Sequence, residues 1–444
     1  MASTTGRPGR ATALRTHLPI SAESHLNHRK ALPLMTSKNR PRALLAALCA
    51  SAVTCAAAQT QPWTLTASQE LSRDTNVYRL ADGVAAAGGL KRGDTLSTTT
   101  LAAGLDQRIG RQHLLGEAAL RVLRYGDNGR LDHEGHTLAA AWAWETVERL
   151  SGTLRAGSTR SLRPYASVAV PGSTARNLET TNEVAALARL GGAGRLSLEG
   201  ALGTRQVDYS DPAYATAELR TDTLALGGRW RTSGALVYGA AWRHTWARYP
   251  VLGDRYHVDA LDFSAESALT GASRLYLRLS PTRARYDAAT ERDFSGLTAA
   301  AQWRWQAGGK LALTLRAVRD LGQDAYLERY GTDGGAAAVR GNVDDSTVLT
   351  RVALEGVYAY SDKTQLSASL GTTRRELSRL PPGQTAVLEG RDTTAAATLG
   401  LRWSPTRHAA LGCDAGLERR TASGALSGPY NASTLTCFAR LGWR

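Results

Sequence analysis

Residues 434–443 read Thr434-Leu-Thr-Cys-Phe-Ala-Arg-Leu-Gly-Trp443, and this stretch decides the fold class. Its apolar side chains fall on every second residue, namely Leu435, Cys437, Ala439, Leu441 and Trp443, and they oppose Thr434, Thr436, Phe438 and Arg440. A period of two predicts a β-strand with one apolar face. The same alternation recurs in units of ~10 residues from Trp63 onward, so we predict an all-β chain.

The connections between the predicted strands alternate between short and long. Short turns are expected at Gly110–Arg111, Arg149–Gly152, Gly191–Gly194, Thr232–Gly234, Thr270–Ala272, Ala307–Gly309, Ser361–Lys363 and Thr406–His408. Longer polar connections include Asp74–Gly93, Gly126–Gly135, Ser167–Glu179, Gly322–Asp345, Leu380–Arg391 and Thr421–Asn431. This rhythm is typical of a transmembrane antiparallel up-and-down β-barrel, and the count predicts about 18 strands (16–18) with both termini in the periplasm.

Aromatic residues are expected to sort by strand end. Eight of the ten tryptophans lie toward the short turns, the exceptions being Trp242 and Trp246. Seven tyrosines lie toward the long connections: Tyr78, Tyr125, Tyr165, Tyr209, Tyr249, Tyr256 and Tyr286. Rings with an apolar body and a polar edge collect at membrane interfaces, so we interpret both sets as interfacial belts.

The polar face of the predicted strands carries Thr, Ser, Gln and charged residues. In a wide membrane barrel this face lines a wet lumen, while the apolar face contacts lipid. The basic candidates for contact with a solute in the lumen are Arg121, Arg229, Arg243, Arg278, Arg304, Arg316, Arg402 and Arg440. A mildly anion-favouring pore is one interpretation of these residues, and a solvated polar face is the other.

Residues 1–58 resemble a leader rather than part of the barrel. A basic segment precedes an apolar run that ends in Ala56-Ala-Ala58, as in a secretory signal peptide. We expect residues 35–58 to be the signal peptide, cleaved after Ala58, residues 1–34 to be an over-long start or a disordered leader, and residues 59–444 to form the barrel. An organelle transit peptide is the alternative. Removing residues 1–58 takes away eight Lys or Arg and one acidic residue, which lowers the formal net charge from +15 to +8. The remaining charges are dispersed, so no nucleic-acid partner is expected.

One short motif follows the first predicted strand. Residues 73–80 read Arg-Asp-Thr-Asn-Val-Tyr-Arg-Leu, and the motif residues are Asp74, Asn76, Tyr78 and Arg79. This segment resembles a signature near the mature N-terminus of outer-membrane barrels encoded beside exopolysaccharide synthesis genes, the EpsL-like family. The resemblance implies a role in exporting a polysaccharide, with export-system proteins as partners. Asp-Thr-Asn is also ordinary turn chemistry, which is the alternative interpretation.

No spacing of residues predicts a catalytic or metal site. The chain has no Gly-x-Ser-x-Gly elbow, and His133 and His136 fit a solvated loop better than a metal site. We therefore expect no enzyme, no cofactor and no metal. Cys413 and Cys437 lie symmetrically about the last long connection, so they could form a cross-strand disulfide or remain two lipid-facing thiols.

Three functions fit these observations. The first is a porin-like channel or accessory protein for exopolysaccharide export. The second is a general small-solute porin, and the third is a structural or adhesive surface barrel without conductance. All three place the chain in the bacterial outer membrane after Sec-type export, with outer-membrane lipid and the barrel-assembly machinery as partners. The solute, the openness of the lumen and the oligomeric state are left open.

Overall fold

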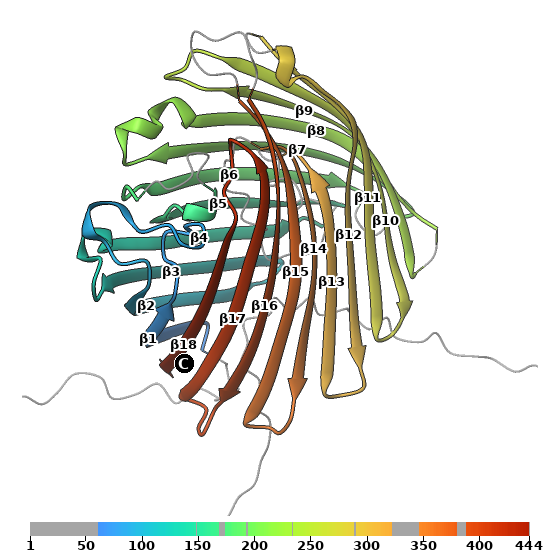
Figure 1. The fold of residues 1–444 in the computed structure, drawn as a ribbon. Coiled ribbons are helices and arrows are strands. Elements are labelled where there is room, and N and C mark those ends of the chain that lie inside the picture. The colour runs from blue at the N-terminus through green and yellow to red at the C-terminus, as the bar shows by residue number, and fades with distance from the viewer. Residues whose placement is uncertain are drawn as a thin grey trace, which may run out of the picture.

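The computed structural model describes residues 61–147, 149–167, 174–191, 194–232, 234–287, 290–321, 346–379 and 388–443. These residues form one antiparallel sheet of 18 strands, in which each strand pairs with its neighbours in sequence (Figure 1). The last strand pairs with the first from Leu65↔Trp443 to Asp74↔Thr434, so the sheet is closed into a barrel. The predicted fold class is confirmed. The leader and the signal peptide lie outside the described residues.

The strands have these bounds: β1 Trp63–Asp74, β2 Asp94–Ile109, β3 Gln112–Tyr125, β4 His133–Glu145, β5 Leu150–Leu162, β6 Leu178–Leu190, β7 Leu196–Tyr209, β8 Leu219–Arg231, β9 Leu236–Arg248, β10 Arg255–Thr270, β11 Ser273–Tyr286, β12 Phe294–Ala307, β13 Leu311–Asp320, β14 Ser346–Ala359, β15 Thr364–Arg379, β16 Leu388–Trp403, β17 Ala409–Gly424 and β18 Tyr430–Trp443. Five short 3-10 helices lie between them: η1 Ala87–Gly89, η2 Gly129–Leu131, η3 Tyr165–Ser167, η4 Pro212–Ala217 and η5 Thr290–Arg292.

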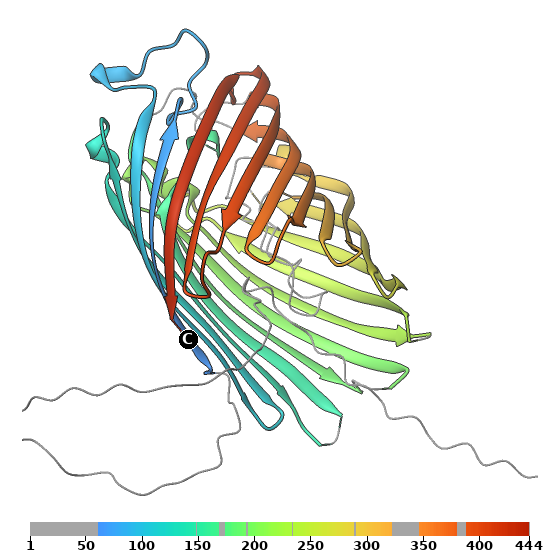
Figure 2. The same ribbon diagram turned by 90° about the horizontal axis from the view of Figure 1, so that it is seen from below.

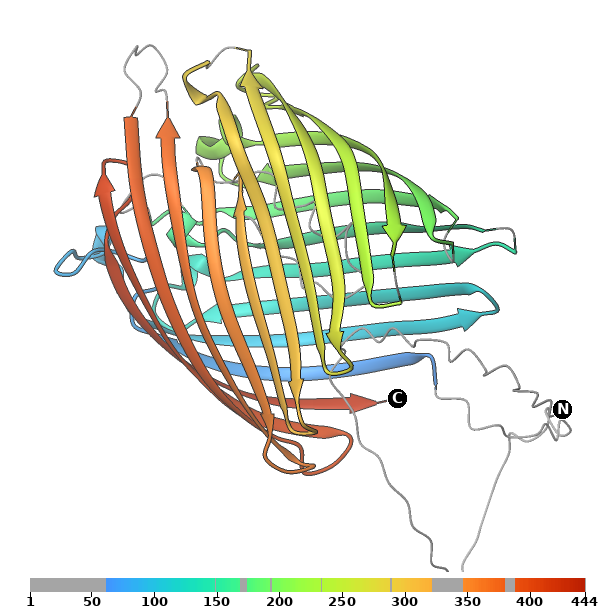
Figure 3. The same ribbon diagram turned by 90° about the vertical axis from the view of Figure 1, so that its right-hand side faces the viewer.

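Short and long connections alternate as predicted, but several strands run further than expected. The connection expected at Thr421–Asn431 shrinks because β17 continues to Gly424 and β18 starts at Tyr430. The first outside loop (residues 75–93, between β1 and β2) keeps its predicted length. Pairing continues beyond the apolar part of the strands because backbone hydrogen bonds do not depend on apolar side chains. The strands therefore project outward on the side of the long loops, and β1 begins where β18 ends, at the other side (Figure 3).

The exterior of the barrel carries the apolar faces of the strands. Leu120, Leu202, Leu399 and Leu417 are between 60% and 67% exposed. An apolar surface of this extent would be unfavourable in contact with water. The polar side chains on the alternate positions face the interior of the barrel. Figure 2 shows the strands of the barrel from below. Because the sheet is closed, every strand has a hydrogen-bonded neighbour on both sides, which is what a hydrocarbon layer demands. The chain is an outer-membrane β-barrel, and its short turns lie at the end that we expect to face the periplasm.

Among the described residues, no helix is long and apolar enough to cross a membrane.

The tryptophans and the tyrosines occupy the predicted strand ends, but only the tryptophans form a belt. Trp63, Trp230 and Trp403 are 48%, 57% and 48% exposed on the exterior. Tyr209 and Tyr256, by contrast, are 9% and 4% exposed, because they occupy inward positions of β7 and β10. They pack with neighbouring apolar side chains into a core inside the outer end of the barrel. The tyrosines therefore lie at the predicted end of the strands, but the prediction that they form a belt on the exterior was wrong, because they face inward.

Candidate permeation path and its constriction

All eight arginines predicted for the lumen occupy inward positions. Each alternates with exterior side chains on its own strand, as Arg402 does with Leu401 and Trp403, and none is exposed. The strands place them at several heights along the lumen wall. Four of these arginines pair with carboxylates, three lie close to other arginines, and one, Arg121, bonds to a hydroxyl.

The paired arginines bind carboxylates on strands one or two positions away in the sheet. Arg243 on β9 donates from Nε and Nη2 to Asp262 on β10, at 3.0 and 3.2 Å. Arg278 on β11 lies 2.9 Å from Asp320 on β13. Arg243 and Arg278 are only 1% and 5% exposed, so these two are wall components rather than contacts for a solute. The prediction that Arg243 and Arg278 contact a solute is therefore corrected. A buried charge needs an oppositely charged partner, and here a carboxylate of the barrel wall covers each guanidinium group.

Two further predicted arginines pair less tightly with the wall. Arg229 on β8 lies 2.7 Å from Glu266, and Arg316 on β13 lies 2.6 Å from Glu355. The Glu355 side chain is 46% exposed, so this pair borders open space in the lumen. Such partly solvated pairs create a transverse field across a pore rather than a fixed contact.

Three further predicted arginines, Arg304, Arg402 and Arg440, lie close to other arginines. Arg304 on β12 lies directly opposite Arg274 on β11, and both face inward. Arg304 also interacts electrostatically with Arg316, and Arg402 with Arg440. Like charges directly opposite each other in a sheet are destabilising. Arg274, Arg304 and Arg316 lie close together on β11–β13, on the half of the lumen wall nearer the short turns, and we call them the basic track.

The last predicted lumen arginine, Arg121 on β3, donates to the Thr137 hydroxyl at 2.8 Å.

Above the basic track, the third outside loop (described residues 163–167 and 174–177, between β5 and β6) crosses the lumen. The carbonyl oxygen of Ala166 in η3 accepts hydrogen bonds from Arg375 on β15, at 3.0 Å, and from Arg420 on β17. These strands are distant from β5 and β6 around the barrel. A loop bonded to a distant wall narrows the passage between them.

A buried carboxylate and a hydroxyl hold Arg375 and Arg420 in the positions from which they donate to Ala166. Arg375 donates to both oxygens of Asp392 on β16, at 3.0 and 2.6 Å, and Ser427 donates to the same carboxylate at 2.6 Å. Arg420 donates to the Thr394 hydroxyl at 2.9 Å. The Asp392 side chain is fully buried. The sequence prediction missed these residues because nothing in the strand pattern says which loop folds inward.

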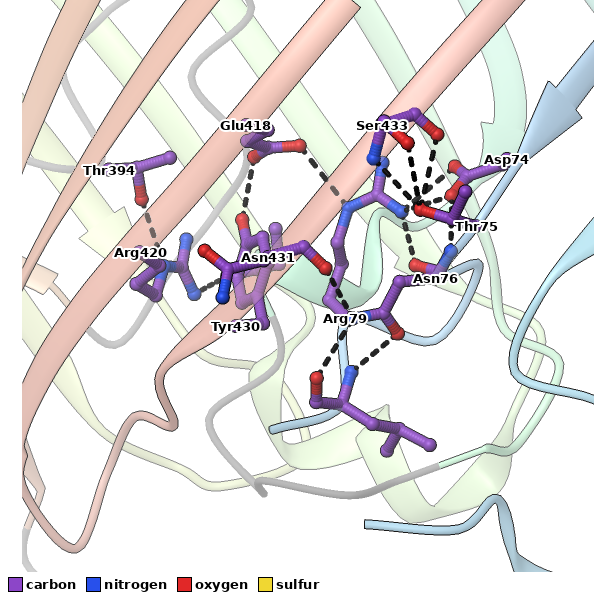
Figure 4. Close-up of polar contacts among 12 residues, drawn as sticks. Asp74, Thr75, Asn76, Arg79, Thr394, Glu418, Arg420, Tyr430, Asn431 and Ser433 are labelled. Atoms are coloured by element: carbon purple, nitrogen blue, oxygen red, sulfur yellow. Dashed lines mark hydrogen bonds and ion pairs between the residues drawn. The ribbon is translucent and has the colours of Figure 1, made fainter. Parts of the chain in front are cut away.

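Three of the four motif residues, Asp74, Asn76 and Arg79, lie at the base of the first outside loop, next to β17 and β18 (Figure 4). Asn76, which is fully buried, accepts a hydrogen bond at Oδ1 from the Leu80 amide at 2.9 Å and donates from Nδ2 to the carbonyls of Leu80 and Asn431, at 2.8 and 2.9 Å. Its own amide donates to Asp74 at 2.7 Å. Asx side chains that bond nearby backbone groups fix tight turns. Asn76 therefore fixes the loop against β18.

Arg79 links this loop to β17. It donates to both oxygens of Asp74, at 3.1 and 2.8 Å, and from Nε to Glu418 at 3.2 Å. Burial opposes its charge, but Asp74 and Glu418 more than offset this, so the pKa of Arg79 lies above its ordinary value. Its φ of 56° is unusual for a residue other than glycine, and these bonds hold it there.

Tyr78, the fourth motif residue, joins the first loop to the second and third. Its hydroxyl donates to Asn128 at 3.1 Å, and its ring packs against Tyr165 of η3 with centroids 5.0 Å apart. Burial raises the pKa of Tyr78 and that of Tyr165, so both phenols stay neutral. The motif residues thus hold the outer mouth together by bonding the first outside loop to the second and third loops and to the wall.

A cavity of about 250 Å³ remains between the motif and the third loop. Its lining includes Asp74, Arg79, Tyr125, Arg163, Tyr165 and Glu418. Ala166 also lines this polar hollow, so the hollow lies beside the contact that narrows the lumen.

The first loop also reaches the outer wall. Asp82 accepts hydrogen bonds from Arg92 and from Asn431, and these bonds hold the pKa of Asp82 below its ordinary value.

Cys413 and Cys437 lie directly opposite each other on β17 and β18, and the structure joins their sulfur atoms. The described residues contain no cluster of three or more His, Cys, Asp or Glu that could hold a metal. The predicted loop Gly322–Asp345 lies outside the described residues.

The chain is similar in structure to outer-membrane proteins of Pseudomonas aeruginosa. OccK2 (OpdF) is 14% identical with a TM-score of 0.45, covering 86% of this chain and 97% of that one. The outer-membrane protein OpdK is 12% identical with a TM-score of 0.44, covering 86% and 99%. OccK2 (OpdF) in complex with glucuronate is 13% identical with a TM-score of 0.45, covering 86% and 98%. At these values the function has to be argued from the residues themselves.

No protein-family model and no curated protein matches the chain. The resemblance of residues 73–80 to the EpsL-like family therefore gains no support.

Proposed function

We propose that the chain is a non-enzymatic porin that passes small, acidic, hydrophilic solutes. The observation that carries this proposal is the basic track below the constriction, in which Arg274 and Arg304 lie directly opposite each other. Two neighbouring guanidinium groups repel each other, and an anion between them removes that repulsion. A carboxylate is the group that their planar donors match best.

The outer mouth supports a small solute over a polymer. The first and third outside loops pack together through Tyr78 and Tyr165, and the Ala166 carbonyl is bonded to the far wall. A solute must pass beside this contact before it reaches the basic track. The hypothesis of exopolysaccharide export, which rests on the motif resemblance, has no comparable observation in its favour, because the motif residues bond to one another and to the barrel wall.

The carboxylates of the wall would limit the selectivity. Glu355 faces Arg316 at 2.6 Å and stays partly exposed, so a cation also finds a partner along the path. We infer a moderate preference for anions. Transport through the pore is passive and follows the concentration gradient of the solute.

Planar-bilayer recording tests the proposal. Purified wild type should conduct and should be anion-selective in a salt gradient. The double variant R274Q/R304Q should shift the reversal potential toward cation selectivity. The matched control is R160Q, which removes an exposed arginine from the exterior of β5 and should leave the reversal potential unchanged.

Two results would overturn the proposal. A folded protein without conductance would favour the structural or adhesive barrel. A reversal potential that R274Q/R304Q leaves unchanged would remove the basic track from the path.

A further inference from the structure

Charges on the exterior of the barrel are confined to its outer end. Among the described strand residues, exterior positions near the periplasmic turns carry no charged side chain, whereas those near the long loops carry twelve arginines and six acidic residues. The arginines are Arg73, Arg124, Arg160, Arg220, Arg248, Arg255, Arg283, Arg285, Arg319, Arg374, Arg391 and Arg419, and all twelve are exposed. We call this set the arginine belt. A charge facing lipid is costly near the bilayer centre and inexpensive at the interface, so the belt marks the outer interface.

Three belt residues lie directly opposite one another on three neighbouring strands. Arg248 on β9 is opposite Arg220 on β8 and also opposite Arg255 on β10. Figure 1 shows these strands side by side. None of the three makes a side-chain hydrogen bond or an ion pair with the part of the chain that the structure describes. Like charges in directly opposite positions destabilise a sheet, and here three occur in a row.

The lumen provides the contrast. Inside it, the buried Arg243 is paired with Asp262 and the buried Arg278 with Asp320. These two buried arginines are therefore neutralised by carboxylates of the barrel itself. A row left without carboxylates on the outer wall indicates an anion that comes from outside the chain.

The surroundings of the row indicate what carries that anion. Trp242 and Trp246, the two tryptophans that do not sort to the periplasmic end, lie on the same face of β9 and are 41% and 51% exposed. On the next strands, Arg285 lies opposite His257, which lies opposite Trp246. Toward the periplasm the face becomes apolar, with Leu226, Leu261 and Phe263 each between 50% and 53% exposed.

Within the described residues, the acidic side chains on this face form no ion pair with the row. Asp208, on β7 near Arg220, accepts hydrogen bonds from Gln206. Asp259 is hydrogen-bonded to His244 at 2.6 Å, and Asp222 lies opposite Trp246 rather than opposite an arginine of the row. Asp254, next to Arg255 in sequence, is 6% exposed and accepts a hydrogen bond from the Arg255 amide.

We propose that Arg220, Arg248 and Arg255 form a binding site for the phosphate groups of an anionic glycolipid in the outer leaflet. Guanidinium groups bind phosphate oxygens in pairs of parallel hydrogen bonds. The tryptophans lie at the depth of the headgroup–acyl boundary, and the apolar side chains below contact the acyl chains. This site lies on the exterior and is independent of what passes through the lumen.

Native mass spectrometry of the detergent-purified barrel tests the site. The probes are a bis-phosphorylated diglucosamine glycolipid, the same glycolipid with both phosphates removed, and phosphatidylglycerol. Wild type should retain the phosphorylated probe on the order of 10- to 100-fold more tightly than R220Q/R248Q/R255Q, because charged hydrogen bonds are lost. The matched control R73Q/R124Q/R319Q removes the same charge from separated belt positions and should bind within about twofold of wild type.

Thermal unfolding distinguishes the loss of the binding site from general damage to the fold of the variant. Without glycolipid, R220Q/R248Q/R255Q should unfold at the same temperature as wild type or higher, because repulsion within the row is removed. With the phosphorylated probe, wild type should gain stability and the variant should not.

Three outcomes would overturn the proposal. The first is equal binding of the phosphorylated and dephosphorylated probes. The second is binding of phosphatidylglycerol as tight as that of the glycolipid, and the third is an equal loss of binding in the control variant.

Discussion

Replacing Arg420 with glutamine should loosen the third outside loop. Arg420 donates to the Ala166 carbonyl and to Thr394, and it is only 8% exposed. A hydrogen bond from a charged donor contributes about 1.5–3 kcal/mol when its partner is retained. Arg375 still donates to Ala166 at 3.0 Å, so the loop stays attached but more weakly.

The magnitude of this change sets the expected signal. Because about 1.4 kcal/mol corresponds to a factor of ten, the loop should be detached on the order of 10- to 100-fold more often in R420Q. Single-channel recordings should then show larger open-channel noise and more frequent high-conductance events. Loop motions of this kind fall in the nanosecond to millisecond range, so event rates need wide-bandwidth recording.

A matched variant separates loop release from the loss of charge. R121Q also removes an inward arginine, one that donates to Thr137 on the neighbouring strand. Both variants should reduce anion selectivity, but only R420Q should raise the noise. Equal noise in R420Q and wild type, or the same increase in R121Q, would refute the assignment of the Ala166 contact as the constriction.

Three further predictions concern stability and covalent structure. D320N leaves a buried arginine of β11 without its carboxylate and should cost about 3–5 kcal/mol in urea unfolding followed by gel mobility, whereas E355Q, at a partly exposed pair, should cost about 1 kcal/mol or less. Asp82 has a depressed pKa, so its contribution to holding the first outside loop is present above its unfolded value and is lost as the pH falls through the folded value; hydrogen exchange in residues 83–92 should rise on acidification of wild type below about pH 4, and D82N should show no such transition. Intact protein should resist alkylation at Cys413 and Cys437 until it is reduced, as mass measurement will show; by chain entropy, opening a bridge over a separation of 24 residues should cost about 3 kcal/mol.

The strand pattern by itself determined the barrel. The alternation around Leu435 and Trp443 says which face of each strand is apolar, and the spacing of short turns and long loops says how many strands there are. Both are local properties, since the side-chain period of a strand is two and a turn joins neighbours. The inward positions of Arg304 and Arg402 follow from the same parity.

Only the tertiary structure decided what each inward arginine does. Arg243 and Arg304 are equivalent by pattern, yet one is buried against Asp262 and the other lies opposite Arg274. The difference depends on the register between strands, which the sequence of one strand does not contain.

The loops and the rows across strands likewise required the closed barrel. Ala166 lies more than 200 positions before Arg375, and only closure brings its carbonyl to that wall. Arg220, Arg248 and Arg255 are separate residues in the sequence and become one row only when β8, β9 and β10 pair. Sequence determined the faces of the strands because facing is local, whereas structure decided partners because pairing and loop closure are not.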